Sequence, residues 1–554
     1  MSERPLTNNL KSGRQLGGDA NWWRSAVVYQ IYPRSYLDTN GDGIGDLAGI
    51  CDKLDYLDWL GVDAIWISPF FTSPMKDFGY DVSNYRGIDP MFGTHEDFGR
   101  LLEKAHKLGI RVLIDLVLSH TADVHEWFKE SRQSKDNAKA DWYVWADPKP
   151  DGTPPNNWLS IFGGSAWEWD SVRRQYYLHN FLASQPDLNF HNTDVQDALL
   201  EVTRFWLELG VDGFRLDTAN MYFHDAALRD NPPLGAGMSV NGIDPVNPYA
   251  MQEPKYNISR PETPGFMERF RLVLDEYPAV TSVGELGAVV DMYETLATYT
   301  EEGKRLHMGY SFDFMTSDYS AAHIRTVVER MQQEIGSGWP CWAFSNHDVE
   351  RVVSRWKVVP EAATMLTALS TCLKGTACLY QGEELGLPEA AVAFEDLQDP
   401  FGIRFWPGYK GRDGCRTPMP WQADESLAGF STADRGWLPV AETHLPLAVD
   451  KQQSTDNSIL QRTRHFLQWR KQYPALLKGD IHFIDAPKGL LAFVREYEQE
   501  KLLCVFQLDG KDSQFDSGFA QVEAIDSEFF GSQLSDGQCV LPAYSMFFGL
   551  VKDS

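Results

Sequence analysis

Four short apolar segments, far apart in the chain, each end in an ionisable side chain. These last residues are His120, Asp217, Glu285 and Asp348. Apolar runs of this length favour buried strands of a parallel sheet. Parallel barrel strands all end at one face, so side chains from distant sequence can meet there. The sequence therefore predicts a parallel barrel whose carboxyl-terminal face carries the chemistry.

Strand and helix patterns alternate along most of the chain, as in a (β/α)8 TIM-type barrel. Each predicted strand is short and nearly continuous in apolar residues, and each predicted helix follows a strand. Strands are predicted at residues 27–32, 64–68, 112–117, 212–217, 279–285, 342–345 and 376–380, and helices at 47–60, 95–108 and 195–209.

Two regions depart from this alternation. After His120 come about 70 residues rich in Trp, Pro, Gly, Asn and Asp, which is long enough to form a subdomain of its own. From about residue 480, short alternating strands indicate an antiparallel β-sandwich domain. The predicted domains are the first part of the barrel, an inserted subdomain after the third strand, the second part of the barrel and the C-terminal domain, at 1–120, 121–190, 191–475 and 476–554.

Composition excludes several classes of partner. The 554 residues carry a net charge of −28, which repels nucleic acid and anionic membranes. The seven cysteines are scattered and form no Cys-x-x-Cys pair, so neither a disulfide framework nor a zinc site is expected. The chain start lacks an apolar signal region, and no apolar run reaches membrane-spanning length. We expect a cytoplasmic protein with reduced thiols and no organic cofactor.

Three carboxylates that meet at one face of a barrel supply the groups needed to cleave a glycosidic bond. Retaining enzymes pair a nucleophilic carboxylate with a carboxylic acid, and their pKa values must differ near neutral pH. Arg215 lies two residues before Asp217, and alternate strand residues point the same way. We therefore expect Arg215 to keep Asp217 ionised.

Five ordered motifs give the chain a specific family resemblance. It resembles glycoside hydrolase family 13, the α-amylase family, over nearly its whole length, in the α-glucosidase and oligo-1,6-glucosidase branch. The resemblance implies that Asp217 is the nucleophile, Glu285 the general acid and base, and Asp348 the third carboxylate, which binds sugar hydroxyls. The motifs lie at residues 115–120, 185–189, 213–217, 283–285 and 344–348.

The same resemblance assigns residues to the terminal glucose. Asp77 and Tyr80 match the pair that binds its hydroxyls and stacks on its ring. Arg416, within the segment 412–421, matches the arginine that helps Asp77 close the pocket. That closure implies exo-acting cleavage, because no sugar can extend past the terminal glucose.

Two histidines and one phenylalanine complete the expected sugar site. His120 and His347 match family histidines that hydrogen-bond glucose hydroxyls, whereas a lone histidine near a strand end is as often a packing residue. Phe162 resembles the aromatic wall contributed by the inserted subdomain. The alternative for Phe162 is a place in the core of that subdomain.

A loop near the start of the chain offers oxygen ligands for a metal ion. Asp38, Asn40, Asp42 and Asp46 alternate with glycines, and the carbonyl of Ile44 adds a fifth donor. Calcium prefers such hard oxygen ligands, although the bidentate glutamate of an EF-hand is absent. The family branch binds structural Ca²⁺ in this loop, and Mg²⁺ is a possible substitute. The alternative is a turn-rich loop without metal.

Two positions indicate specificity within the branch. Ser119 stands where α-amylases have an asparagine that binds a second calcium, which argues against an amylase proper. Thr218, directly after the nucleophile, goes with α-1,4 preference in related enzymes. The segment around residues 214–225 and Gly284-Glu-Leu-Gly287 resemble bacterial α-glucosidases that transglucosylate. We expect a retaining α-glucosidase for short substrates such as maltose, with sucrose as a further candidate.

Other functions compete with this interpretation. A dedicated glucosyltransferase, or a sucrose or trehalose isomerase, would share the same three carboxylates. Catalytically silent relatives that support amino-acid transporters carry a transmembrane helix and have usually lost catalytic carboxylates, unlike this chain. A carbohydrate-binding module would not need an acid, a nucleophile and a stabiliser together. The sequence leaves a monomer or a homodimer open.

Overall fold

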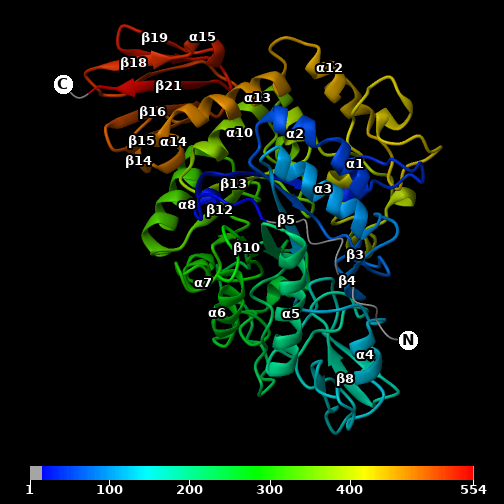
Figure 1. The fold of residues 1–554 in the computed structure, drawn as a ribbon. Helices are drawn as coiled ribbons and strands as arrows, with labels where there is room; N and C mark the ends of the chain where they lie inside the picture. Colours follow the sequence, from blue (N-terminus) through cyan, green and yellow to red (C-terminus); the bar gives the residue numbers. More distant parts are fainter. Residues whose placement is uncertain (1–14, 553–554) are drawn as a thin grey trace.

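The computed structural model describes residues 15–552, and its centre is a closed barrel (Figure 1). Within these residues the barrel has eight parallel strands, each paired with the next along the chain, and the last pairs with the first. The strands are β1 (Val27–Ile31), β2 (Ala64–Ile67), β5 (Arg111–Leu116), β9 (Gly213–Leu216), β10 (Thr281–Glu285), β11 (Met308–Tyr310), β12 (Pro340–Ala343) and β13 (Thr376–Tyr380).

The predicted barrel is confirmed, with one strand that the sequence pattern did not indicate. The missed strand is β11, which has three residues and is shorter than the runs that a periodicity pattern can detect. Helices follow the strands around the outside (Figure 1). They include α1 (Leu47–Asp52), α2 (Leu54–Leu60), α3 (His95–Lys107), α5 (Thr193–Leu209), α6 (Thr263–Leu274), α7 (Met292–Tyr299), α8 (Ala321–Glu334) and α10 (Ala363–Cys372).

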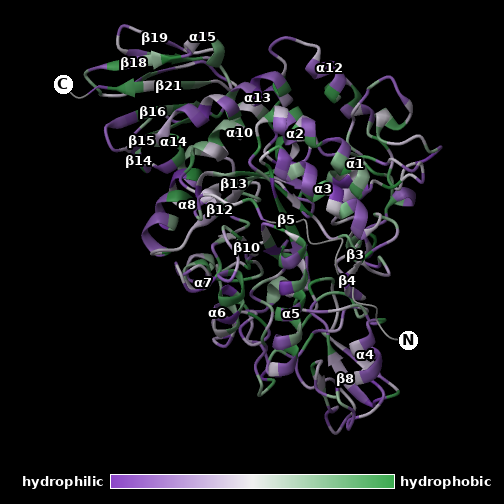
Figure 2. Ribbon diagram, in the orientation of Figure 1, coloured by the Kyte–Doolittle hydropathy of each residue, from purple (hydrophilic) through white to green (hydrophobic). Residues whose placement is uncertain are grey.

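Helix α3 shows why these segments form the outer layer. Thr94 and Asp97 form a capping box that satisfies free amide groups at its start. Phe98, Leu101 and Ala105 recur at helical spacing and are buried, while the other face is polar. Figure 2 shows both hydrophilic and hydrophobic residues along α3 and α5. Burial of the apolar stripe against the barrel therefore fixes the helix in place.

An inserted subdomain leaves the barrel after its third strand, as predicted. It holds α4 (Glu126–Ser131) and an antiparallel sheet in the order β6-β8-β7. The strands are β6 (Trp145–Ala146), β7 (Trp167–Asp170) and β8 (Gln175–Leu178). Because it follows β5 directly, the subdomain stands beside the carboxyl-terminal face of the barrel.

The C-terminal region forms two antiparallel sheets that share a hydrophobic core. Alternate residues of β15 and β16 face the smaller sheet, with Leu503 and Val505 packing near Phe515 and Leu541. The larger sheet holds β14 (Asp480–Ile484), β15 (Leu490–Tyr497), β16 (Glu500–Gln507), β21 (Met546–Val551) and β18 (Val522–Ile525); the smaller holds β17 (Ser513–Asp516), β20 (Gln538–Leu541) and β19 (Gln533–Ser535). The predicted boundary at 475/476 lies within α14 (Pro474–Lys478), and the domain boundaries stay predictions.

Two findings concern the chain as a whole: the state of its cysteines and the character of its helices. All seven cysteines are free thiols in the structure. Among residues 15–552, no helix has the length and apolar character needed to cross a bilayer.

Candidate active site

One buried arginine joins three carboxyl groups at the carboxyl-terminal end of the barrel. Arg215 Nη1 lies 2.6 Å from Asp217 Oδ1 and 3.0 Å from Asp115 Oδ1. Its Nη2 lies 2.6 Å from Glu285 Oε2 and 2.9 Å from the Tyr310 hydroxyl. The structure therefore brings the predicted nucleophile and the predicted acid onto a single guanidinium, which is itself fully buried.

The carboxyl groups of this cluster hold protons more tightly than free carboxyls do. Burial raises the pKa of both Asp217 and Glu285 to about 7 and that of Asp115 to about 6, although Arg215 opposes each shift. The sequence predicted that Arg215 keeps Asp217 ionised. In the structure the same cation is shared with two other carboxyls, so its effect on Asp217 is diluted. Closely spaced carboxyls titrate together and retain a proton near neutral pH.

A strained turn at Thr218 connects the nucleophile to the acid. Thr218 has φ of 41°, in the left-handed region that a β-branched residue rarely adopts. In this conformation its backbone N–H donates to Glu285 Oε2 at 3.1 Å. Its hydroxyl lies 3.3 Å from Asp217 Oδ2 and 3.0 Å from Ser119 Oγ. Thr218 thus orients both carboxyl groups, and Ser119 supports it from the neighbouring strand end.

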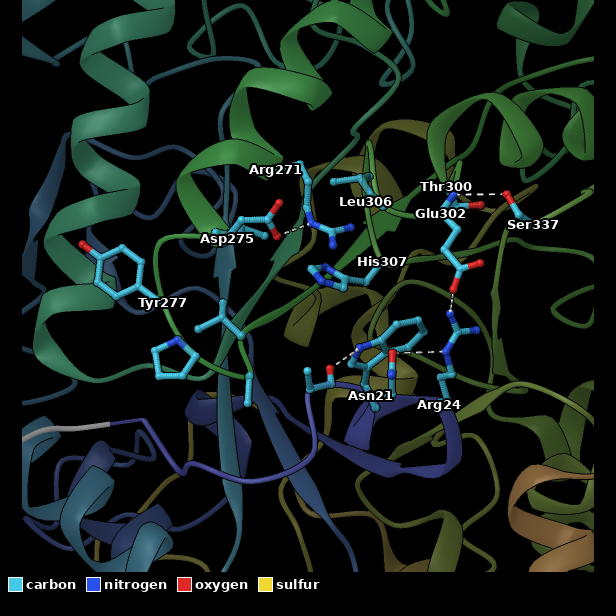
Figure 3. Close-up of a pocket in the computed structure, with 17 residues that line it drawn as sticks. Asn21, Arg24, Arg271, Asp275, Tyr277, Thr300, Glu302, Leu306, His307 and Ser337 are labelled. Carbon is cyan, nitrogen blue, oxygen red and sulfur yellow. Dashed lines mark hydrogen bonds and ion pairs between the residues drawn. The ribbon is translucent and has the colours of Figure 1, made fainter.

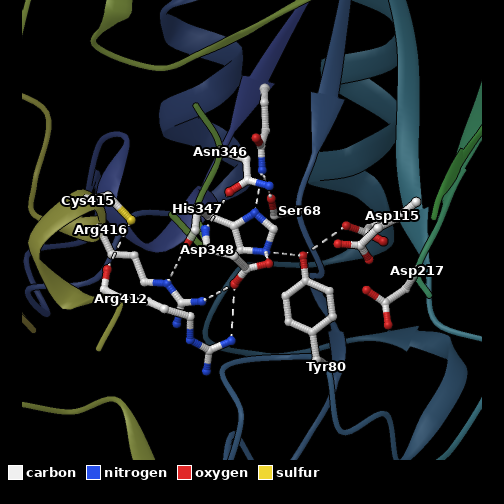
Figure 4. A network of polar contacts seen from close by, with 12 residues as sticks. Ser68, Tyr80, Asp115, Asp217, Asn346, His347, Asp348, Arg412, Cys415 and Arg416 are labelled. Atoms are coloured by element: carbon white, nitrogen blue, oxygen red, sulfur yellow. Dashed lines mark hydrogen bonds and ion pairs between the residues drawn. The ribbon is translucent and has the colours of Figure 1, made fainter. Parts of the chain in front are cut away.

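Asp348 lies in a second, more positive environment (Figure 4). Its Oδ1 accepts hydrogen bonds from Arg416 Nη2 at 2.8 Å and Arg412 Nη1 at 3.1 Å. His347 Nε2 lies 3.2 Å from Oδ2. Burial alone would raise the pKa of Asp348, but the charges of Arg412 and Arg416 outweigh burial and lower that pKa. Its side chain is 24% exposed, against 8% for Asp217 and Glu285, so this carboxylate is charged and the most accessible of the three.

The arginine that contacts Asp77 is Arg412, which corrects the role expected for Arg416. Arg412 Nη2 lies 2.9 Å from Asp77 Oδ1, and Asp399 holds Arg412 through Nε at 3.1 Å and Nη2 at 2.8 Å. Arg416 instead donates to the His347 carbonyl at 2.7 Å and to Asp348. Arg412 directly precedes the 3₁₀ turn Asp413–Arg416, and Arg416 ends it. The hydrogen bonds from Arg412 to Asp399 decide which of the two reaches Asp77.

Tyr80 and His347 form a stacked, fully hydrogen-bonded pair. Their rings lie 5.3 Å apart and are nearly parallel. The Tyr80 hydroxyl lies 2.6 Å from His347 Nε2 and 3.1 Å from Asp115 Oδ2. Gln30 Nε2 lies 2.7 Å from His347 Nδ1, and burial lowers the pKa of His347 so that the ring is neutral. Both ring nitrogens therefore bond to the protein, and the expected contact with a sugar hydroxyl stays a prediction.

His120 belongs to the same site, and both of its ring nitrogens also bond to protein atoms. Its Nδ1 lies 2.8 Å from Ser119 Oγ, and its Nε2 lies 2.8 Å from the carbonyl oxygen of Tyr80. Burial lowers the pKa of His120 to about 4. Gln185, from the fifth motif, donates to Asp77 Oδ2 at 3.1 Å. In this structure His120 and Gln185 hold Tyr80 and Asp77 in position, and hydroxyl binding by His120 stays a prediction.

An aromatic wall joins the inserted subdomain to the barrel. The ring of Phe162 stacks on Phe401 with centroids 5.1 Å apart, and Phe181 meets it edge-on at 5.6 Å. The Arg412 guanidinium carbon lies 5.1 Å from the centre of the Phe162 ring. Phe162 therefore packs over the Arg412 guanidinium, and its role as a wall of the sugar site stays a prediction.

The predicted calcium loop is tightly folded around its own carboxylates. Asp38 accepts hydrogen bonds from the amides of residues 40, 41 and 43, and Asp46 caps α1 through the Gly49 amide. Asp42 is exposed, and one of its oxygens accepts the Ile44 amide. Oxygen ligands folded in this way suit a hard cation. Within residues 15–552, however, no group of three or more His, Cys, Asp or Glu side chains is arranged to hold a metal, so the ion stays a prediction.

Several residues of the site were not singled out from the sequence. Asp115 and Gln185 stand inside motifs that were identified, and Arg412 precedes Arg416 by four residues, so a signal for each was present. Tyr310 ends the three-residue strand β11, and Phe401 stands in the short helix α11 (Pro400–Phe405). Only the fold shows that those two side chains reach the pocket.

Comparisons with known proteins agree with this geometry. The family description "Alpha amylase, catalytic domain" matches residues 30–479. The chain is 54% identical over 551 residues to the "Probable alpha-glucosidase" of Rhizobium meliloti, covering 98% of this chain and 99% of that one. It is 40% identical to the "Oligo-1,6-glucosidase" of Heyndrickxia coagulans, covering 89% of this chain and 93% of that one.

Solved structures extend the likeness to the whole fold. The crystal structure of an α-glucosyl transfer enzyme superimposes with a TM-score of 0.93 at 55% identity, over 96% of this chain and 99% of that one. The trehalulose synthase of Pseudomonas mesoacidophila gives a TM-score of 0.86 at 32% identity, over the same shares of the two chains. With its eight-stranded barrel and its arginine-linked carboxylates, the chain belongs to the α-amylase family of glycoside hydrolases.

Proposed function

We propose that this enzyme is a retaining, exo-acting α-glucosidase. The observation that carries the proposal is the placement of Asp217 and Glu285 on the two terminal nitrogens of Arg215. Retaining glycosidases need two carboxyl groups close together, one acting as a nucleophile and one as an acid. The names of the relatives support glucose as the sugar that is transferred.

The proposed reaction proceeds in two steps. In the first, ionised Asp217 attacks the anomeric carbon, and the bond from that carbon to the leaving oxygen breaks as Glu285 gives the oxygen its proton. In the second, Glu285 takes a proton from water, the water oxygen attacks the anomeric carbon, and the ester to Asp217 breaks. Two inversions return the α-anomer. The buried cluster holds the one proton that the first step requires.

Exo action is supported by the closure of the pocket. Arg412 ties Asp77 to Asp348, and Phe162 covers this ion pair. We propose that the hydroxyls of the terminal glucose bind to these charged groups. A longer chain could not pass beyond them, so cleavage would release single glucose units from the non-reducing end.

The proposed substrates are short α-glucosides, with α-1,4 linkages preferred and sucrose as a further candidate. Thr218 supports this preference through the family resemblance, although one small side chain usually gives only about 1–3 kcal/mol of discrimination. Transfer to a second sugar would use the same intermediate with a sugar hydroxyl in place of water.

A second candidate is a dedicated glucosyltransferase or a sucrose isomerase. It is supported by the solved neighbours, which are named an α-glucosyl transfer enzyme and a trehalulose synthase. Both candidates form the same ester to Asp217. They differ in what attacks it, since the isomerase returns the released sugar to the same glucose.

The test is a time-resolved proton NMR experiment on the purified enzyme with maltose and, separately, with sucrose. Early release of α-glucose from maltose supports a retaining α-glucosidase, and new trisaccharide signals measure transfer. Early β-glucose would contradict the retaining mechanism. If maltose is unchanged and sucrose yields an isomer without free glucose, the isomerase is the correct candidate.

We also propose that the loop of Asp38–Asp46 holds a structural Ca²⁺, with Mg²⁺ as a substitute. Asp38, Asn40, Asp42 and Asp46 would supply side-chain oxygens, and Ile44 its carbonyl. The ion would stabilise the fold and would take no part in the two chemical steps.

A further inference from the structure

A pocket lies where strands β10 and β11 begin, at the opposite end of the barrel from the candidate active site. Figure 3 shows its lining residues. The pocket has a volume of about 440 Å³ and is lined by residues 20–24, the end of α6, and the segments that lead into β10 and β11. These segments precede their strands, whereas the catalytic carboxyls stand at or after strand ends. The length of the barrel therefore separates the pocket from Asp217 and Glu285.

The charged groups that line this pocket balance one another. Arg271 Nε lies 2.7 Å from Asp275 Oδ1, and Arg24 forms an ion pair with Glu302. Two cations thus face two anions, and the chain as a whole carries a net charge of −28. The balance gives an anionic ligand no electrostatic advantage and favours a neutral one.

His307 presents a single hydrogen-bond donor to the pocket. Ser282 Oγ accepts the backbone N–H of His307 at 3.2 Å, which leaves the serine hydrogen free for His307 Nδ1 at 3.0 Å. We assign the ring hydrogen to Nε2, because the serine hydroxyl can then donate to Nδ1. Burial, with Arg271 and Arg24 nearby, lowers the pKa of His307 to about 3, so the ring is neutral. Within residues 15–552, Nε2 has no hydrogen-bond acceptor.

The remaining lining offers both polar and apolar contacts. Asp275 uses one carboxylate oxygen for Arg271, and its other oxygen can accept a further hydrogen bond. Leu274, Leu306 and Trp23 contribute the apolar part of the lining. Ligand pockets typically span about 300–1,000 Å³ and combine apolar walls with a few directed polar groups. A pyranose matches this lining, because its hydroxyls meet the polar groups and its ring carbons meet the apolar ones.

We propose that this pocket is a second binding site, for a neutral pyranose such as glucose. The site is separate from the catalytic pocket and does not depend on the function proposed for it. Its polar contacts are His307 Nε2 and the free oxygen of Asp275. The ligand also touches the segment that enters β10, whose last residue is Glu285.

The test is isothermal titration calorimetry of glucose into the Asp217→Asn enzyme, which does not turn over. Two binding processes are expected. Adding Asp275→Asn or His307→Leu should weaken one of them about tenfold, the change expected for one lost hydrogen bond. The matched control is Glu334→Gln, which removes a carboxylate from an Arg330 pair of the same i, i+4 type outside the pocket and should change neither process.

A further variant, Asp77→Asn, separates this proposal from the proposed function. It should weaken only the process in the catalytic pocket. A single process that Asp77→Asn weakens and Asp275→Asn leaves unchanged would overturn the second site and leave the proposed function intact. Tight binding of inorganic phosphate that glucose does not displace would also overturn it, because the pocket would then select anions. If no process responds to Asp77→Asn, the proposed function fails instead.

Discussion

Two clusters of arginine and carboxylate groups in the candidate active site differ in how tightly their carboxyl groups hold protons. The Tyr80 hydroxyl joins them, because it contacts Asp115 of the first cluster and His347 beside the second. In the first, Arg215 alone serves Asp217, Glu285 and Asp115, and the pKa of each carboxyl is raised. In the second, Arg412 and Arg416 converge on Asp348, and the pKa of that carboxyl is lowered. The residue types are the same in both clusters.

The number of cations per carboxyl decides the difference. Burial disfavours a charged carboxylate in both clusters. One shared guanidinium cannot offset this cost for three groups, so the first cluster retains a proton that can be moved. Two guanidiniums contact Asp348 and more than offset it, so Asp348 keeps its charge. Only Arg412 contacts Asp77, and burial still raises the pKa of that carboxyl to about 6. A mobile proton suits chemistry, and fixed charges suit the binding of hydroxyls.

Removing the nucleophile of the first cluster should cause the largest loss of activity. Asp217→Asn should lower kcat on maltose by at least about 10⁴-fold, because no covalent intermediate can form. Steady-state kinetics with a coupled glucose assay measures the loss, and circular dichroism controls for an intact fold. Activity close to that of the wild type would exclude Asp217 as the nucleophile.

The loss of activity on removing the acid should depend on the leaving group of the substrate. Glu285→Gln should lower kcat on maltose by about 10²–10⁴-fold. On a dinitrophenyl α-glucoside, whose leaving group needs no proton, the loss in the first step should be much smaller. Pre-steady-state release of dinitrophenol measures that step directly. Equal losses on both substrates would contradict the role of Glu285 as the acid.

Exchanging arginine for lysine should distinguish the two cations of the second cluster. Arg412→Lys should raise KM for maltose by about 10–100-fold, because lysine cannot bridge Asp77, Asp348 and Asp399 at once. Arg416→Lys is the matched control, since Arg412 still holds Asp77 in that variant. A larger effect of Arg416→Lys on KM would restore the role that the sequence gave to Arg416.

Stability should reveal the raised pKa of Glu285. Its folded-state value is about 7 against an ordinary 4.5, so folding favours the protonated form. The associated stability is present below pH 4.5 and is lost as pH rises through 7, by at most about 3 kcal/mol. Glu285→Gln should therefore raise Tm by a few degrees at pH 8 and hardly at all at pH 4.5. An equal rise at both pH values would contradict the raised pKa.

Metal removal should have the smallest effect and should spare both clusters. Treatment with a chelator should lower Tm by a few degrees, and added Ca²⁺ should restore it by mass action. Asp42→Asn should weaken the response, whereas Asp424→Asn, an exposed aspartate elsewhere, serves as the control. An unchanged Tm, with no calcium detected by atomic emission in the purified protein, would refute the metal site.

Most of the predicted site residues came from motifs at strand ends. The last residues of β9 and β10, and the turns that follow, stand at the barrel face in any parallel barrel, so Asp217 and Glu285 had to meet. The strand β11 was not predicted, because its three residues, Met308–Tyr310, are too few to show a hydrophobic periodicity. Its last residue, Tyr310, nevertheless accepts a hydrogen bond from Arg215 of the central cluster.

Loops were harder to interpret because their residues have no fixed geometric relation. Arg412 and Arg416 stand in the same motif, and the sequence alone assigned the contact with Asp77 to the wrong one. The backbone between Asp399 and Arg412 decides this contact, since three hydrogen bonds to Asp399 hold the Arg412 side chain and amide in place.

The sequence by itself determined the barrel, the inserted subdomain, the C-terminal sheets and which three carboxylates stand at the ends of barrel strands. Strand periodicity and motif order are properties of the linear sequence, so they can be recognised without the fold. The tertiary structure alone decided how many cations each carboxylate meets, which arginine reaches Asp77, and that a neutral pocket lies at the far end of the barrel. Proton affinity and cavity shape depend on burial and on distances between residues hundreds of positions apart, and these exist only in the folded protein.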